Sequence, residues 1–157
     1  MSPREHLDLV VRPNMTAMKA DLGDIRLAFN AIAAVDGLAA QIYWWAFHNS
    51  SQHVAGMVDD TDYRGRLAKQ DNDFRLLFET AKAVKHGRLT RGSPSVRAAD
   101  QVVASITGWD NFRWDDARWD INQVRIEPIG ETPWTLEGVL DRALAFLERQ
   151  MATLGIP

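Results

Sequence analysis

Residues 21–47 read DLGDIRLAFNAIAAVDGLAAQIYWWAF, and apolar side chains recur in this stretch at intervals of three and four positions. Such spacing places the apolar side chains along one face of an α-helix. The face is made by Leu22, Ile25, Phe29, Ile32, Ala39, Tyr43 and Ala46. We therefore expect a long helix over residues 21–47 that buries this face against a second element.

A second apolar stripe of the same kind runs through residues 62–86. Its members are Tyr63, Leu67, Phe74, Leu77, Ala81 and Val84. Gly87 directly follows Lys85 and His86, which is a typical signal for the end of a helix. Two stripes of similar length with a short connection predict an antiparallel pair of long helices over residues 21–87.

Asp36 falls on the first stripe, between Ile32 and Ala39. A buried carboxylate costs free energy unless it is paired or hydrogen-bonded. One interpretation is that Asp36 faces a cation of the second helix, an oligomer seam or a pocket. The other, which we favour, is that Val35 is buried and Asp36 lies at the edge of the stripe.

The remaining segments complete a predominantly helical α+β fold in a single domain of 157 residues. Residues 1–13 alternate in polarity and predict an extended arm. Residues 100–130 predict a small antiparallel β-ribbon with a Trp-rich connection between its strands. Thr135 is a suitable N-cap for a C-terminal helix that we expect over residues 135–154.

The composition narrows the class of protein. The chain has no cysteine, which excludes disulfides and thiolate chemistry and fits a reducing, cytoplasmic location. Residues 27–47 are long enough to span a membrane, but Asn30, Asp36 and Gln41 interrupt them, so we expect a buried helix and no membrane partner. The four histidines lack the spacing of a metal site, and we expect no metal or cofactor.

A basic turn is the first candidate site. Its proposed ligand or phosphate contacts are Lys82, Lys85, His86, Arg88 and Arg91, with Arg97 close by. No acid occurs within residues 81–97, although the chain as a whole has a net charge of −3. The turn either binds the phosphates of a nucleic acid or only complements the dipole at the end of a helix, and the second interpretation is favoured.

Arg75, Glu79, Lys82 and His86 follow one another at helical spacing and share a face of the second predicted helix. A histidine, a carboxylate and two cations on one face are compatible with an acid–base site that handles phosphate. We favour a ladder of ion pairs, Arg75–Glu79 and Glu79–Lys82, because no nucleophile lies nearby in the sequence.

Aromatic residues are concentrated in residues 108–120, GWDNFRWDDARWD. Trp and Arg are enriched at protein interfaces, and the candidate interface residues here are Trp109, Phe112, Trp114 and Trp119. Internal packing over the helices is the equal alternative. Tyr43, Trp44 and Trp45 point in three directions on a helix, so at least one of them is expected to pack on another element or a second subunit.

The run Ala81-Lys82-Ala83-Val84-Lys85-His86 resembles the end of the second helix in uncharacterised bacterial and phage-associated helical proteins, which close with Ala-x-x-x-Lys-His. Over residues 20–90 the pair of helices is also similar to the HEPN ribonuclease and antitoxin-partner bundles. Their signature is an Arg followed by a His after four to six residues. Ten residues separate Arg75 from His86, so no catalytic role is carried over.

No nucleophile elbow, phosphate loop, dinucleotide fingerprint or zinc-protease motif occurs in the sequence. We therefore predict a non-catalytic protein-interaction module that self-associates into a homo-oligomer and can have a further protein partner. The alternative is a nucleic-acid-binding or HEPN-like protein that uses the basic turn at residues 82–97.

Overall fold

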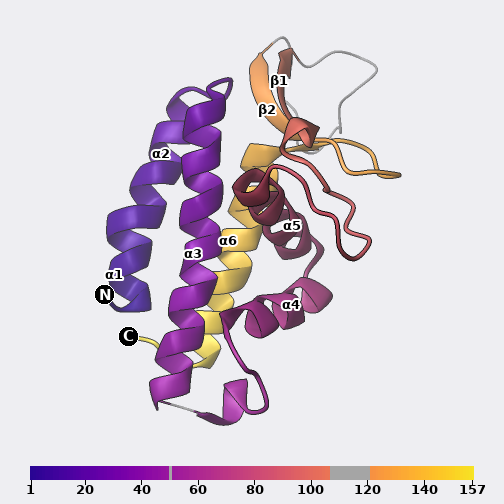
Figure 1. The fold of residues 1–157 in the computed structure, drawn as a ribbon. Helices are drawn as coiled ribbons and strands as arrows, with labels where there is room; N and C mark the ends of the chain where they lie inside the picture. The colour runs from indigo at the N-terminus through magenta and orange to yellow at the C-terminus, as the bar shows by residue number, and fades with distance from the viewer. Residues whose placement is uncertain (50, 107–120) are drawn as a thin grey trace.

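The computed structural model describes residues 1–49, 51–106 and 121–157. The chain begins with a continuous helical rod that packs along the long helix α3 (Figure 1). The rod consists of α1 (Pro3–His6), a π-helical turn (Leu7–Val11) and α2 (Arg12–Ala20), and α3 spans Ile25–Asn49.

The predicted extended arm at residues 1–13 is therefore wrong. Ser2 and Glu5 form a capping box, in which each side chain accepts a hydrogen bond from the other's backbone N–H, and Pro3 begins the helix. Leu7, Val11 and Met15 recur every four residues and are buried, so the apolar period is helical. Residues 7–11 alternate in polarity as a strand does, but Leu7 and Val11 also fit the four-residue spacing of a helix. The alternation alone was therefore misleading.

The long helix expected over residues 21–47 is confirmed as α3. It starts at Ile25, after Asp24 accepts hydrogen bonds from the backbone N–H groups of Arg26 and Leu27. Its buried face is rotated from the predicted one, because Ile25 is 37% exposed while Ala28, Val35 and Leu38 are fully buried.

Among the described residues α3 is also the helix that is long and apolar enough to cross a membrane by length and composition. Ten of its side chains are buried in the core, against neighbours that include α2, α4, α5 and α6. A core helix of this kind passes the same test, so the packing is compatible with a soluble protein.

The second predicted long helix is two helices, α4 (Asp60–Gln70) and α5 (Asn72–His86). Asp71 between them is extended, and its carboxylate accepts a hydrogen bond from the Phe74 N–H as the N-cap of α5. The apolar stripe continues across this break, which is why periodicity alone predicted one helix. Asp59 is the N-cap of α4, and its side chain accepts hydrogen bonds from the N–H groups of Thr61 and Asp62.

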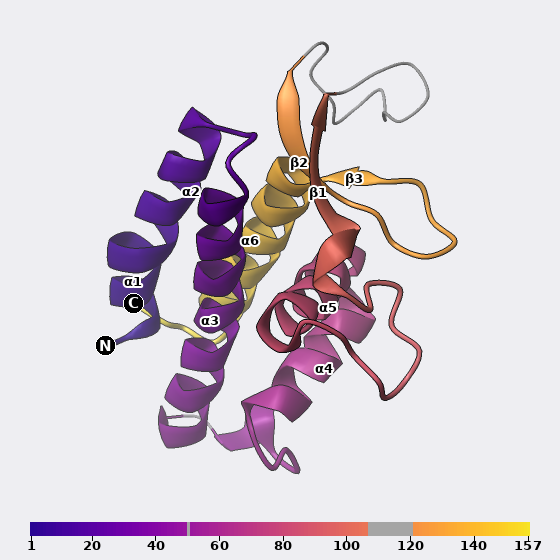
Figure 2. The same cartoon turned by 45° about the horizontal axis from the view of Figure 1, so that its top comes forward.

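A three-stranded antiparallel sheet lies at one end of the C-terminal helix (Figure 2). The predicted ribbon is confirmed as β1 (Val102–Ile106) paired with β2 (Asn122–Ile126), and β3 (Trp134–Thr135) adds a short third strand. The C-terminal helix α6 (Leu136–Thr153) follows, with the Thr135 side chain as its N-cap. The fold is α+β and predominantly helical, as predicted.

Both interpretations of Asp36 hold in part: it lies at the edge of the buried face, and it pairs with a cation of the next helix. Val35 is fully buried and faces the core, whereas the Asp36 side chain is 15% exposed at its edge. There it forms an ion pair with Arg64 of α4, which also pairs with Asp60. Burial raises the pKa of Asp36, and the Arg64 guanidinium acts in the opposite direction.

Candidate functional site

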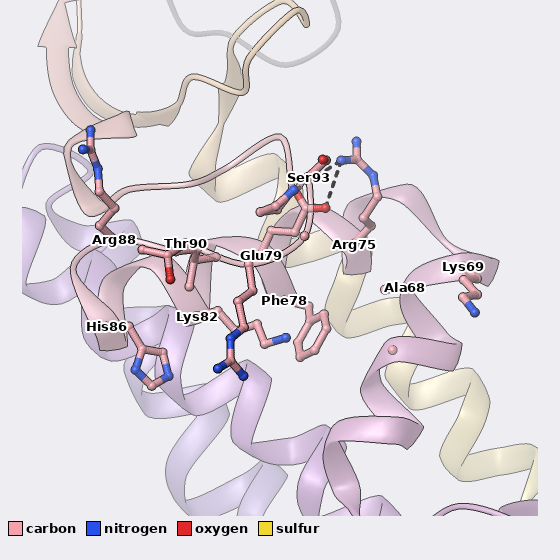
Figure 3. Close-up of a pocket in the computed structure, with 15 residues that line it drawn as sticks. Ala68, Lys69, Arg75, Phe78, Glu79, Lys82, His86, Arg88, Thr90 and Ser93 are labelled. Atoms are coloured by element: carbon pink, nitrogen blue, oxygen red, sulfur yellow. Dashed lines mark hydrogen bonds and ion pairs between the residues drawn. The ribbon is translucent and has the colours of Figure 1, made fainter.

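A groove of about 960 Å³ lies between α4, α5 and the loop of residues 88–94, and we call it the cationic groove (Figure 3). The charged residues that line it are Lys69, Arg75, Glu79, Lys82, His86, Arg88 and Arg91. Figure 3 shows His86, Lys82 and Phe78 along α5, with Ala68 and Lys69 of α4 across from them. The remaining lining is small or apolar and includes Gly65, Ala68, Phe78 and Leu89.

Glu79 holds the loop in place and is the one carboxylate among the described residues that line the groove. Its Oε2 atom accepts hydrogen bonds from the Ser95 N–H (2.8 Å), the Ser95 hydroxyl (2.8 Å) and the Val96 N–H (3.1 Å). Arg75 lies 3.3 Å from the same oxygen. This acid is therefore occupied by structural contacts and leaves the groove with a strong excess of positive charge.

Arg75 is structural as well. Its guanidinium donates to Asn72, Ser95 and Glu131, in addition to Glu79. The predicted Arg75–Glu79 ion pair is confirmed.

The second predicted pair, Glu79–Lys82, is not formed. The Lys82 ammonium instead lies 4.3 Å from the ring centroid of Phe78, where a cation–π contact holds it in the groove.

The other cations of the groove have no carboxylate partner in the described part of the chain. Among the residues that the structure describes, Lys69, Lys82, His86, Arg88 and Arg91 form no ion pair and no side-chain hydrogen bond. Four of them belong to the predicted patch. They come from two helices and a loop and converge on one concave surface, an arrangement that attracts anions.

Lys85, which also belongs to the predicted patch, does not line the groove. Its charge acts on Asp36 instead, where it lowers the carboxyl pKa against the larger effect of burial. Arg88 lies at the border of the groove: it also lines the neighbouring hollow beside Arg97, and Figure 3 shows its guanidinium directed away from His86.

Sequence reasoning missed the α4 wall of the groove, which carries Gly65, Ala68 and Lys69. A Cβ atom added at Gly65 would meet no atom within 4 Å, so packing does not require glycine there. Glycine inside a helix costs about 1 kcal/mol relative to alanine. The smooth, open wall was not visible in the sequence because α4 and the basic turn meet only in the folded chain.

The described lining of the groove presents several hydrogen-bond donors that suit an anion. Within the described ranges, His86 has no hydrogen-bonded carboxylate or carbonyl that would orient its ring as a base. Among the same residues, no group of three His, Cys, Asp or Glu is placed to hold a metal ion. The hydroxyl groups of Thr90 and Ser93 in the loop can donate hydrogen bonds to anionic oxygens.

The candidate interface Trp109, Phe112, Trp114 and Trp119 lies outside the described residues. Trp44 is the exposed member of the aromatic triplet, with 45% of its surface accessible, while Tyr43 is buried. In comparisons with family models, curated proteins and solved structures, none matches this chain.

Proposed function

We propose that this chain is a non-catalytic binding protein whose cationic groove holds the phosphate groups of a nucleic-acid strand. The observation that carries the proposal is the convergence of Lys69, Lys82 and Arg91 on a groove whose one carboxylate is already occupied. Phosphate contacts of this kind supply most of the affinity of sequence-independent nucleic-acid binding.

Recognition is directed at the backbone rather than the bases. Phe78 is the aromatic residue that lines the groove, it is only 8% exposed, and Lys82 covers its ring. Base stacking needs a free aromatic face, which the described lining of the groove does not offer. The proposal therefore predicts binding without sequence preference. It corresponds to the alternative function from the sequence, and the HEPN resemblance and a cytoplasmic location remain predictions beside it.

The test is fluorescence anisotropy of a labelled oligothymidylate with the protein and a double charge reversal, Lys69→Glu with Arg91→Glu. Both side chains are exposed and lack partners among the described residues, so we expect the variant to fold. A matched control is Arg4→Glu with Arg26→Glu, which changes the net charge equally but outside the groove. Binding lost in the first variant and kept in the control supports the proposal, whereas equal binding by both contradicts it.

Self-association is a second candidate function, and the aromatic end of α3 supports it. Trp44 and Phe47 are 45% and 50% exposed, and their rings lie 5.8 Å apart in an edge-to-face contact. Met1, which is 72% exposed, lines a hollow next to Trp44. Exposed aromatic clusters of this kind are typical of protein interfaces.

Light scattering coupled to size-exclusion chromatography tests this second candidate. We expect a dimeric or larger mass that becomes monomeric in Trp44→Ser with Phe47→Ser. A wild-type chain that stays monomeric at high concentration would exclude self-association through this surface.

A further inference from the structure

A second hollow of about 400 Å³ is lined by residues of the turn after α3, of α4 and of the C-terminal end of α6, and it shares no lining residue with the cationic groove. Its lining is mostly polar and includes Gln52, Tyr63, Arg66, Gln70 and Gln150. Pockets of this size, with a few convergent polar groups, are typical sites for small molecules.

Two buried polar atoms beside this hollow lack hydrogen-bond partners. Tyr63 is only 1% exposed, and its hydroxyl oxygen is unpartnered within the described chain, as is the buried Nε atom of Arg66. The Arg66 guanidinium lies 5.2 Å from the ring centroid of Tyr63, so both groups belong to one wall. A buried polar group without a partner is destabilising, and each one in a folded protein calls for an explanation such as a bound water or ligand.

The charge of the hollow is positive. No carboxylate lines it, and Arg66 forms no ion pair with any residue that the structure describes. The side-chain amides of Gln70 and Gln150 likewise have no described partner, and each offers both donors and an acceptor.

We propose that this hollow binds a small organic carboxylate that also carries hydroxyl or amine groups. The Arg66 guanidinium pairs with the carboxylate, and the Tyr63 hydroxyl donates a second hydrogen bond to it. The amides of Gln70 and Gln150 bond the neutral polar groups. This site is separate from the cationic groove and does not depend on nucleic-acid binding.

The donor in this arrangement is present at every physiological pH. Burial raises the pKa of Tyr63 to about 12, with the nearby Arg66 guanidinium acting in the opposite direction. The hydroxyl therefore stays protonated and can donate, while its deprotonated form, which would repel a carboxylate, is not populated.

Isothermal titration calorimetry with citrate and L-glutamate tests the proposal on the full chain, with inorganic phosphate as an anion that lacks a carboxylate. We expect at least one carboxylate to bind more tightly than phosphate. Binding is about tenfold weaker or lost in Arg66→Gln, because the charge-assisted hydrogen bonds are removed. The variant Lys69→Glu with Arg91→Glu keeps carboxylate binding, which separates this site from the cationic groove.

The variant Tyr63→Phe tests the site without the risk that the protein fails to fold. Within the described residues the hydroxyl it removes has no hydrogen-bond partner by geometry, so we expect unchanged or higher thermal stability together with weaker carboxylate binding. The proposal is overturned if neither carboxylate binds the wild-type chain, if phosphate binds equally well, or if Arg66→Gln and Tyr63→Phe bind like the wild type.

Discussion

Glu79 and Ser95 are joined by two hydrogen bonds, because the backbone N–H and the hydroxyl of Ser95 both donate to Oε2 of Glu79 over 2.8 Å. These hydrogen bonds hold Ser95, in the segment after α5, against the middle of that helix. It also removes the one carboxylate of the cationic groove from competition with an anionic ligand. A structural need and a functional one are thus met by the same acid.

Replacing this acid is expected to loosen the loop. Glu79→Gln removes the charge that Arg75 and the three donors share, and the side chain is only 15% exposed, so we expect a loss of about 1.5–3 kcal/mol in the free energy of unfolding. Urea denaturation measures it. Glu148→Gln, at an exposed ion pair with Arg12, should lose less than about 1 kcal/mol. Equal losses in both variants would show that Glu79 does not hold the loop.

Substitutions at Gly65 should affect the stability of α4 and binding in the groove in different ways. Gly65→Ala should raise the free energy of unfolding by about 0.5–1 kcal/mol, because a Cβ atom there meets nothing within 4 Å. Gly65→Leu projects a larger side chain from the α4 wall and should weaken oligothymidylate binding while the chain stays folded. Anisotropy and thermal melting together measure both effects. A Gly65→Leu variant that binds like the wild type would exclude this wall from the binding path.

Asp36 should make stability depend on pH. Its pKa is raised in the folded state by burial, so the native chain binds a proton more tightly than the unfolded chain. The neutral carboxyl is therefore favoured below the unfolded pKa, and this stability is lost as the pH rises through the higher folded pKa. Relative to Asp36→Asn, the wild type should lose stability over that range, by at most about 1.4 kcal/mol per pH unit.

Urea unfolding of both proteins between acid and neutral pH measures this difference, and comparing them cancels the titration of every other group. Parallel curves would mean that Arg64 fully offsets the burial of Asp36.

Salt should weaken nucleic-acid binding in proportion to the phosphates that the groove neutralises. Four lysine and arginine side chains that line it have no partner among the described residues, Lys69, Lys82, Arg88 and Arg91. We expect a slope of log affinity against log salt of about −3 for a single strand, and a change of roughly 0.7 on removing one cation, as in Arg91→Gln. A slope near zero would indicate that binding, if seen, is not carried by phosphate contacts.

The elements of the fold were predictable where one local signal dominated. Thr135 was recognised as a helix cap because a side-chain oxygen directly before an apolar helical stripe is typical of an N-cap. Asp71 carries the same signal and was missed, since the stripe of Tyr63, Leu67 and Phe74 keeps its period across the break. Likewise, Ser2 and Glu5 form a capping box. This signal for a helix start outweighs the alternation in polarity of the residues that follow.

The site was only half predictable. Lys82, His86 and Arg91 are close in sequence, so their grouping was visible. Lys69 and Gly65 join them only through the packing of α4 on α5, which no local pattern encodes. The role of Glu79 also depends on tertiary contacts, because Ser95 reaches it across a loop that the sequence leaves unplaced.

The central claim is that phosphates of a nucleic-acid strand enter the cationic groove, and amide chemical-shift mapping tests it most directly. Titrating a short oligothymidylate into ¹⁵N-labelled protein should shift the resonances of Lys69, Lys82 and Arg91 and of the loop between them. Resonances of Gln150 and Trp44, which lie outside the groove, should stay in place. Shifts confined to those other surfaces, or no shifts at all, would contradict the account.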